Sequence, residues 1–176
     1  MIYIVNGAPG AGKTTFEKFV KEEMGEDYCE ILSTIDFIKQ IAYECGWDGN
    51  KTPRSRKFLS DLKDLLTEWN DLPYNKTASK VNVLVDEYEY YNIKNYAIFI
   101  DCREPKEIAK LKEKLGAKTI LVEGNTKEEI SNHADKEVNN YKYDIIIKNL
   151  RDLSHLRLIA KKFVEVENLH RKKGVD

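Results

Sequence analysis

The most constraining feature of this chain is the octapeptide GAPGAGKT, which runs from Gly7 to Thr14. It matches the phosphate-binding pattern G-x-x-x-x-G-K-[ST] at every specified position. A short apolar run at 2–5 precedes it and apolar residues at helical spacing follow it, which predicts a strand, a glycine turn and a helix. In that arrangement the backbone N–H groups of the turn surround an anion at the N-terminus of the helix. The flanking elements favour this interpretation over a glycine-rich turn with a solvated lysine.

The residues of this loop are predicted to share the binding of a nucleoside triphosphate. Lys13 is predicted to reach the β- and γ-phosphates and to act as a catalytic residue, and the hydroxyl of Thr14 is predicted to hold Mg²⁺. The loop therefore predicts ATP and Mg²⁺ as cofactors. The predicted nucleotide-binding residues are Gly7, Ala8, Pro9, Gly10, Ala11, Gly12, Lys13, Thr14 and Thr15.

Length and composition limit the kind of molecule that carries the loop. The 176 residues, 41% hydrophobic and 34% charged, suit one α/β domain that spans 1–176. A net charge of −1 argues against nucleic-acid polymers and anionic membranes as partners, and no apolar run approaches the roughly 20 residues of a membrane span. The three cysteines are widely spaced and no signal peptide is recognisable, so we expect a reduced, cytoplasmic protein. We expect it to be a monomer or a weak homodimer.

Alternating strand and helix patterns predict a three-layer α/β fold, with a parallel sheet and helices on both faces. The expected strands cover 1–6, 30–34, 96–101, 118–122 and 143–147. The expected helices cover 13–24, 35–45, 55–71, 76–91, 105–115 and 150–169, with a weak helical signal from about 127. We expect a loop at 47–56 and a break at 72–74, and VNVLV within 76–91 also fits a strand. The apolar stripe of the 55–71 helix is interpreted as core: Phe58, Leu59, Leu62, Leu65, Leu66 and Trp69.

Two charged residues follow the apolar run at 97–100, where the carboxyl ends of parallel strands bind ligands. Asp101 is predicted to hold Mg²⁺, directly or through water; its alternative role is a cap for the helix that opens at Pro105. Arg103 is predicted to be a catalytic residue that neutralises the transferring phosphoryl group. The alternative for Arg103 is an ion pair with Glu104 or Glu107.

A second group of polar residues is predicted to serve an acceptor. Asp36 follows the second strand and would orient or deprotonate an acceptor, although it also suits an ordinary carboxylate at a helix N-terminus. Arg54 and Arg56 lie in the expected loop and would bind an acceptor phosphate in bidentate fashion. A solvated basic face is the alternative for these two arginines.

With these residues in place, the chain resembles P-loop kinases of the nucleoside monophosphate kinase fold. The resemblance is to phage deoxynucleoside monophosphate kinases and animal-type phosphomevalonate kinases, and it spans nearly the whole chain. It implies a five-stranded sheet in the order 2-3-1-4-5, an acceptor-binding region at about 35–75 and a lid at about 123–140. The motifs that carry it are GAPGAGKT, STIDFIKQIA at 33–42, KTPRSRKFLSDLKDLLTEW at 51–69, DCRE at 101–104 and HADKEVNNYKYDIIIKN at 133–149.

The resemblance implies phosphoryl transfer from ATP to a small phosphorylated acceptor, with a nucleoside or deoxynucleoside monophosphate as the expected one. Kinases of this fold usually carry arginines in the lid, but 123–140 contains none. Either Arg54, Arg56 and Arg103 supply the positive charge, or the chain has lost efficient transfer. Two alternatives stay open, namely a kinase of another phosphorylated metabolite, such as phosphomevalonate, and a nucleotide-binding regulatory ATPase without an acceptor.

Overall fold

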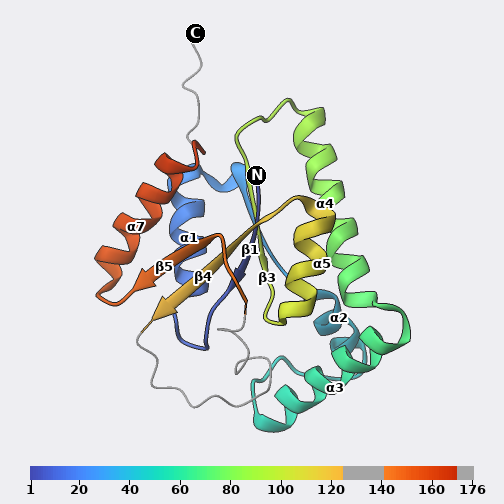
Figure 1. Ribbon diagram of the computed structural model, residues 1–176. Helices are drawn as coiled ribbons and strands as arrows, with labels where there is room; N and C mark the ends of the chain where they lie inside the picture. Colours follow the sequence, from blue (N-terminus) through green and yellow to red (C-terminus); the bar gives the residue numbers. More distant parts are fainter. Residues whose placement is uncertain (125–140, 170–176) are drawn as a thin grey trace.

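Five parallel strands form the centre of the molecule, a computed structural model in which residues 1–124 and 141–169 are described. The strand order is β2-β3-β1-β4-β5, and each neighbouring pair is parallel (Figure 1). This order and the helices on both faces confirm the expected α/β fold. The strands are β1 (Ile2–Asn6), β2 (Cys29–Ser33), β3 (Ala97–Asp101), β4 (Lys118–Gly124) and β5 (Ile145–Asn149).

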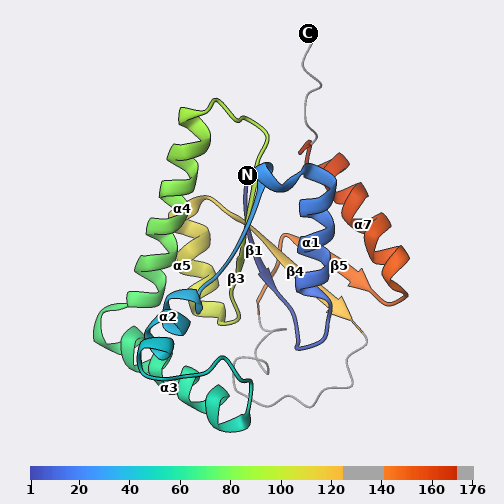
Figure 2. The same cartoon turned by 180° about the vertical axis from the view of Figure 1, so that it is seen from behind.

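The helices cover the two faces of the sheet and one of its ends. Figures 1 and 2 show α1 and α7 together and α4 and α5 together, with α2 and α3 lying at the end of the molecule toward which β1 runs. The helices are α1 (Lys13–Met24), η1 (Glu26–Tyr28, a 3-10 turn), α2 (Asp36–Glu44), α3 (Pro53–Asn70), α4 (Leu72–Tyr90), α5 (Pro105–Leu115) and α7 (Leu153–Val166).

Alternating side chains of the strands build two apolar layers. Tyr3 and Val5 of β1 belong to the layer under α1 and α7, whereas Ile4 belongs to the layer under α4 and α5. Such alternation follows from the two-residue period of a strand. The first layer is rich in aromatic rings: Tyr3 stacks on Phe99 with ring centroids 5.3 Å apart, and its edge contacts the ring of Phe163. The first layer holds α1 against the strand from which the glycine loop emerges.

The boundaries around α3 differ from those expected. The expected loop at 47–56 ends at Thr52, whose hydroxyl accepts a hydrogen bond from the N–H of Ser55 at 3.1 Å, with Pro53 at the first helical position. The expected break at 72–74 is also wrong, because α4 already begins at Leu72. Only Asp71 separates α3 from α4, and its left-handed backbone (φ 58°) makes the turn. Thr52 caps α3, and each of the two helices has a proline in its first turn, so both begin earlier than the apolar pattern indicates.

The apolar stripe of α3 is not core, contrary to the interpretation from the sequence. Leu65 is 63% exposed and Trp69 is 79% exposed, and Phe58 is exposed as well. The residue of α3 that is buried is Lys63. The stripe was misjudged because helical spacing shows that a helix has an apolar face, but not whether the fold supplies a surface to cover it.

The remaining expectations meet the structure as follows. Helix α4 contains VNVLV, so the helical alternative is the correct one. Cys29, Cys45 and Cys102 are free thiols. The weak helical signal from about 127, and all of the expected lid except its first two residues, lie outside the described residues; those two residues end β4. Within 1–124 and 141–169, no helix has the length and apolar character to cross a membrane.

The burial pattern predicts opposite outcomes for two aromatic truncations. Phe99→Ala should lower the free energy of unfolding by about 3–5 kcal/mol, because the ring is fully buried between β-sheet and helices. Trp69→Ala should change it by less than about 0.5 kcal/mol, since the ring is largely exposed. Urea denaturation of both variants measures the difference. Similar losses in the two variants would show that the α3 stripe belongs to the core after all.

Candidate functional site

The glycine loop lines a pocket of about 350 Å³ at the carboxyl end of the sheet. The loop joins β1 to α1, so the N–H groups of the first turn of α1 face the space beside it. All predicted nucleotide-binding residues except the buried Gly7 line the pocket, and Arg103 lies at its border with them. The lining residues are Ala8, Pro9, Gly10, Ala11, Gly12, Lys13, Thr14, Thr15 and Arg103.

The loop keeps its shape because it is packed tightly against the ends of β4 and β5. Gly12 has a left-handed backbone (φ 95°), and a side chain there would collide with the amide of Asn149. The Asn149 Nδ2 donates a hydrogen bond to the Ala11 carbonyl at 2.9 Å. From β4, Gly124 approaches so closely that a Cβ would lie 2.6 Å from the same carbonyl oxygen. Glycine is therefore required on both sides of this contact.

Asn6, the last residue of β1, connects the loop to the neighbouring strand end. Its side chain is fully buried. Its Oδ1 accepts a hydrogen bond from the N–H of Gly7 at 2.7 Å, and its Nδ2 donates to the Arg103 carbonyl at 3.0 Å and to the Tyr143 hydroxyl at 2.8 Å. Sequence reasoning missed this residue, although a polar side chain that ends an apolar strand directly before the glycine motif was a usable signal. Asn6 fixes the loop and the backbone of Arg103 relative to each other.

Lys13 and Asp101 place opposite charges beside the loop. The Lys13 Nζ donates to the Gly7 carbonyl at 2.9 Å, which folds the side chain back along the loop. Burial raises the pKa of Asp101; the positive charges of Lys13, Arg103 and Lys39 oppose this shift, and the carboxylate of Asp36 adds to it. The N-cap of α5 is Glu104, so Asp101 does not cap that helix. Tertiary structure thus puts Asp36 and Lys39 within electrostatic reach of Asp101.

The residues present fit a Mg²⁺ ion that enters with a nucleotide. Asp101 Oδ1 is buried and accepts no hydrogen bond from the part of the chain that the structure describes, so an oxygen suited to a cation lies at the end of β3. Thr14, in the first turn of α1, adds a hydroxyl on the same pocket. In the described part of the chain no cluster of three or more His, Cys, Asp or Glu side chains could enclose a metal by itself. Mg²⁺ needs only one or two carboxylates when phosphate oxygens and water complete its shell.

A second buried carboxylate, on Glu17, lies in the same charge cluster. It is fully buried on α1, and neither of its oxygens has a hydrogen-bond partner within residues 1–124 and 141–169. Burial raises its pKa to about 8; the charge of Asp101 raises it further, and that of Lys13 opposes the shift. Sequence reasoning overlooked Glu17, although it is a charge on the buried face shared by Phe16, Val20 and Met24.

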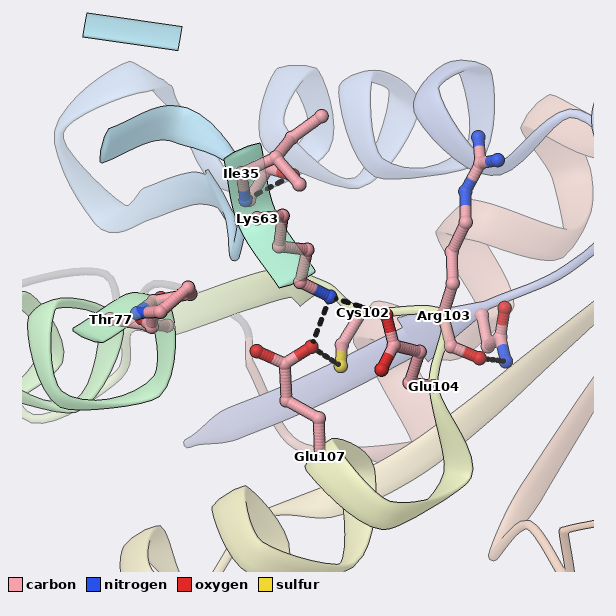
Figure 3. A network of polar contacts seen from close by, with 10 residues as sticks. Ile35, Lys63, Thr77, Cys102, Arg103, Glu104 and Glu107 are labelled. Atoms are coloured by element: carbon pink, nitrogen blue, oxygen red, sulfur yellow. Dashed lines mark hydrogen bonds and ion pairs between the residues drawn. The ribbon is translucent and has the colours of Figure 1, made fainter. Parts of the chain in front are cut away.

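Lys63 anchors α3 to the segment that follows Asp101. Its Nζ donates to Glu104 Oε1 and to Glu107 Oε2, each at 2.8 Å, and Cys102 Sγ donates to Glu107 Oε2 at 3.4 Å. Figure 3 shows Lys63 between the two glutamates, with the guanidinium of Arg103 directed away from them. Burial lowers the pKa of Lys63, but the carboxylates of Glu107 and Glu104 outweigh this and hold it above its usual range. The two glutamates considered as partners for Arg103 are therefore paired with Lys63.

The predicted acceptor residues lie on α2 and α3. Asp36 Oδ2 accepts from the Ser33 N–H at 2.7 Å and its Oδ1 from Lys39 Nζ at 3.0 Å, so it stabilises the start of α2. Arg54 and Arg56 are exposed in the first turns of α3 rather than in a loop, and they are not among the residues that line the loop's pocket. The part that these three residues play toward an acceptor stays a prediction.

A second hollow, of about 400 Å³, lies along α4 and has no phosphate chemistry. It is lined by Val83, Asp86, Glu87, Tyr90 and Tyr91. Its two charged residues are acidic and would repel a phosphate. The pocket beside the glycine loop is therefore the candidate site for an anionic ligand.

Comparison with known proteins supports the fold without a sequence relationship. No protein-family model matches the chain, and no curated protein matches it. Among the solved structures that match is the unliganded crystal structure of a sugar kinase from Janibacter sp. HTCC2649. That protein is 13% identical, the alignment covers 97% of this chain and 98% of that one, and the TM-score is 0.53. The likeness is one of fold.

The buried Glu17 predicts a pH-dependent stability. Because its pKa is raised from 4.5 to about 8 on folding, the folded protein holds the proton more tightly than the unfolded chain does. Glu17 thus costs stability as pH rises from about 5 to about 8. Glu17→Gln removes this cost and should be more stable than the native protein by roughly 2–4 kcal/mol at pH 8, with little difference at pH 5. Urea denaturation at both pH values, without nucleotide or metal, gives the comparison; a constant difference contradicts it.

The Lys63 anchor predicts a large loss of stability on truncation of its charge. Lys63→Met leaves Glu107 buried without its cation, which should cost about 3–5 kcal/mol. In the Lys63→Met, Glu107→Gln double variant the loss should be smaller than the sum of the single losses, because the two side chains interact. The matched control is Lys57→Met, which breaks the exposed pair with Asp61 and should cost less than about 1 kcal/mol. Equal losses for Lys63→Met and the control would exclude an anchoring role.

Proposed function

We propose that this protein transfers the γ-phosphoryl group of ATP to a small phosphorylated acceptor, and that the acceptor is a nucleoside or deoxynucleoside monophosphate. The proposal rests on one observation: Arg103, two residues after the end of β3, lines the same pocket as the glycine loop. A loop alone suffices to bind a nucleotide, but an arginine beside the phosphates neutralises charge that develops during phosphoryl transfer. The P-loop kinase architecture supports the same reading.

The donor would be held by the glycine loop. Backbone N–H groups and Lys13 bind the β- and γ-phosphates, which requires the Lys13 Nζ to leave the Gly7 carbonyl. Thr14 and Asp101 would hold Mg²⁺, which when bound neutralises the phosphate oxygens. The hydrogen bond from Asn6 to the Arg103 carbonyl holds the backbone of Arg103 in place beside the loop. Catalysis then consists mainly of positioning and charge neutralisation.

The acceptor would enter between the loop and the helices at the carboxyl end of the sheet. Arg54 and Arg56 bind its phosphate, and Asp36 orients it. The second pKa of a phosphate monoester is about 6, so the attacking oxygen is already ionised at neutral pH and no general base is required. The oxygen attacks the γ-phosphorus, the bond to the β-phosphate oxygen breaks, and ADP leaves with that electron pair.

The experiment that tests the proposed reaction is an acceptor screen. The protein is incubated with ATP and Mg²⁺ and a panel of nucleoside monophosphates, deoxynucleoside monophosphates, phosphomevalonate and sugars, and ADP release is measured. Sugars belong in the panel because the matched structure is described as a sugar kinase. Lys13→Ala is the control that removes donor chemistry. ADP release that no panel member stimulates would contradict the proposal and favour the regulatory ATPase.

The acceptor residues give a prediction of their own. Arg54→Ala and Arg56→Ala should each weaken the use of the best monophosphate acceptor by about tenfold or more, because a charge-assisted contact to phosphate contributes roughly 1.5–3 kcal/mol. ATP affinity, measured by calorimetry, should be unchanged. Lys57→Ala is the matched control, because Lys57 is an equally exposed cation that is paired with Asp61. If all three variants lose acceptor use equally, or none does, the acceptor binds elsewhere.

A further inference from the structure

Glu17 is a buried charge in a position where helix packing calls for an apolar residue. The buried residues of α1 are Phe16, Glu17, Val20 and Met24. Glu17 is 0% exposed, and neither carboxylate oxygen accepts a hydrogen bond from any described residue. An isolated buried carboxylate is costly, and a leucine or methionine would fill the same space without that cost. The residue therefore destabilises the unliganded fold and calls for a functional explanation.

Packing places Glu17 near the end of β3. The ring of its neighbour Phe16 lies 6.4 Å from that of Phe99 on β3, and Asp101 follows Phe99 by two residues, so strand alternation directs it into the same layer under α1. The charges of Asp101 and of Lys13, which lies one helical turn before Glu17 on α1, act on Glu17, and Lys13 lines the nucleotide pocket. Two carboxylates with buried oxygens that accept no hydrogen bond from any described residue thus lie near each other in the layer under α1.

Two such carboxylates favour positive charge beside them, and Lys13 is one source of it. In the structure its Nζ donates to the Gly7 carbonyl, and a bound triphosphate would draw it toward the phosphates. A small divalent cation with oxygen ligands satisfies both carboxylates at once, whether each coordinates directly or through water. Thr14 supplies a hydroxyl on the same side of α1.

We infer that Glu17 acts with Asp101 as a carboxylate pair for the divalent cation that accompanies the nucleotide. The inference rests on the nucleotide pocket of the proposed function, and it does not depend on the acceptor. It gives Glu17 a role that the glycine motif does not specify, because the motif assigns the cation only to its own hydroxyl. The energetic cost of burying Glu17 in the free protein is then offset when nucleotide and cation bind together.

The test measures how much Mg²⁺ strengthens the binding of a non-hydrolysable ATP analogue. Calorimetry gives the dissociation constant of AMP-PNP with EDTA and again with MgCl₂, for the native protein, Glu17→Gln and Asp101→Asn. Outer carboxylates typically contribute tenfold to hundredfold to metal affinity. Glu17→Gln should therefore reduce the Mg²⁺-dependent gain by about tenfold or more, while affinity in EDTA stays within about twofold. Electron paramagnetic resonance of Mn²⁺ bound to the protein with AMP-PNP should show the same loss.

The control is Glu23→Gln, an exposed carboxylate on the same helix, which should keep the full gain. If Glu17→Gln does not fold, as judged by circular dichroism, Glu17→Met replaces it, because an apolar side chain suits the buried face. A Mg²⁺-dependent gain that survives in the Glu17 variant, or that is absent in the native protein, overturns the inference. Failure of the native protein to bind AMP-PNP in either buffer would instead refute the proposed function, so the two failures are distinguishable.

Discussion

The structure depends on the parallel register of β1 with its two neighbours. Val5 lies opposite Asp101 on β3, and Asn6 lies opposite Leu121 on β4. Because parallel strands all end at one edge, this register brings the glycine loop, Asp101 and Asn149 to the same place from three segments that are distant in the sequence. The Asn6 amide then joins two of these segments by hydrogen bonds to Gly7 and to the Arg103 carbonyl. Without the register, the loop would be a mobile glycine turn rather than a rigid anion site.

Buried charge is the second theme of this molecule. Lys63 is the buried residue of α3, and Glu17 shares the buried face of α1 with Phe16, Val20 and Met24. Their situations differ, because Lys63 is compensated by Glu104 and Glu107, whereas the carboxylate of Glu17 accepts no hydrogen bond from any described residue. A compensated buried charge fixes the position of one element against another, while an uncompensated one reduces stability until a ligand arrives. The first describes a structural anchor, and the second is typical of a binding site.

The attachment of α3 distinguishes the side of the molecule that we propose to bind the acceptor. This helix carries the predicted acceptor arginines, yet its buried contact to the segment after β3 is an ion pair rather than an apolar seam. Its exposed Phe58, Leu65 and Trp69 show that the helix has little core of its own to hold it. Elements with few buried apolar contacts open at low free energy. A helix attached in this way suits a region that must admit and release an acceptor.

The sequence alone determined the architecture and the phosphate loop, because both rest on local patterns. Strand and helix periodicities, glycines at Gly25 and Gly116 that end helices, and the motif at Gly7–Thr14 all act over a few residues. The strand order followed from the resemblance to P-loop kinases and is confirmed by the sheet. Tertiary structure alone decided which charged residues are buried and what they meet. The partners of Asn6, Glu17 and Lys63 are 97, 84 and 44 residues away in Arg103, Asp101 and Glu107. No local pattern encodes such separations, since they arise only when the sheet brings distant strand ends together.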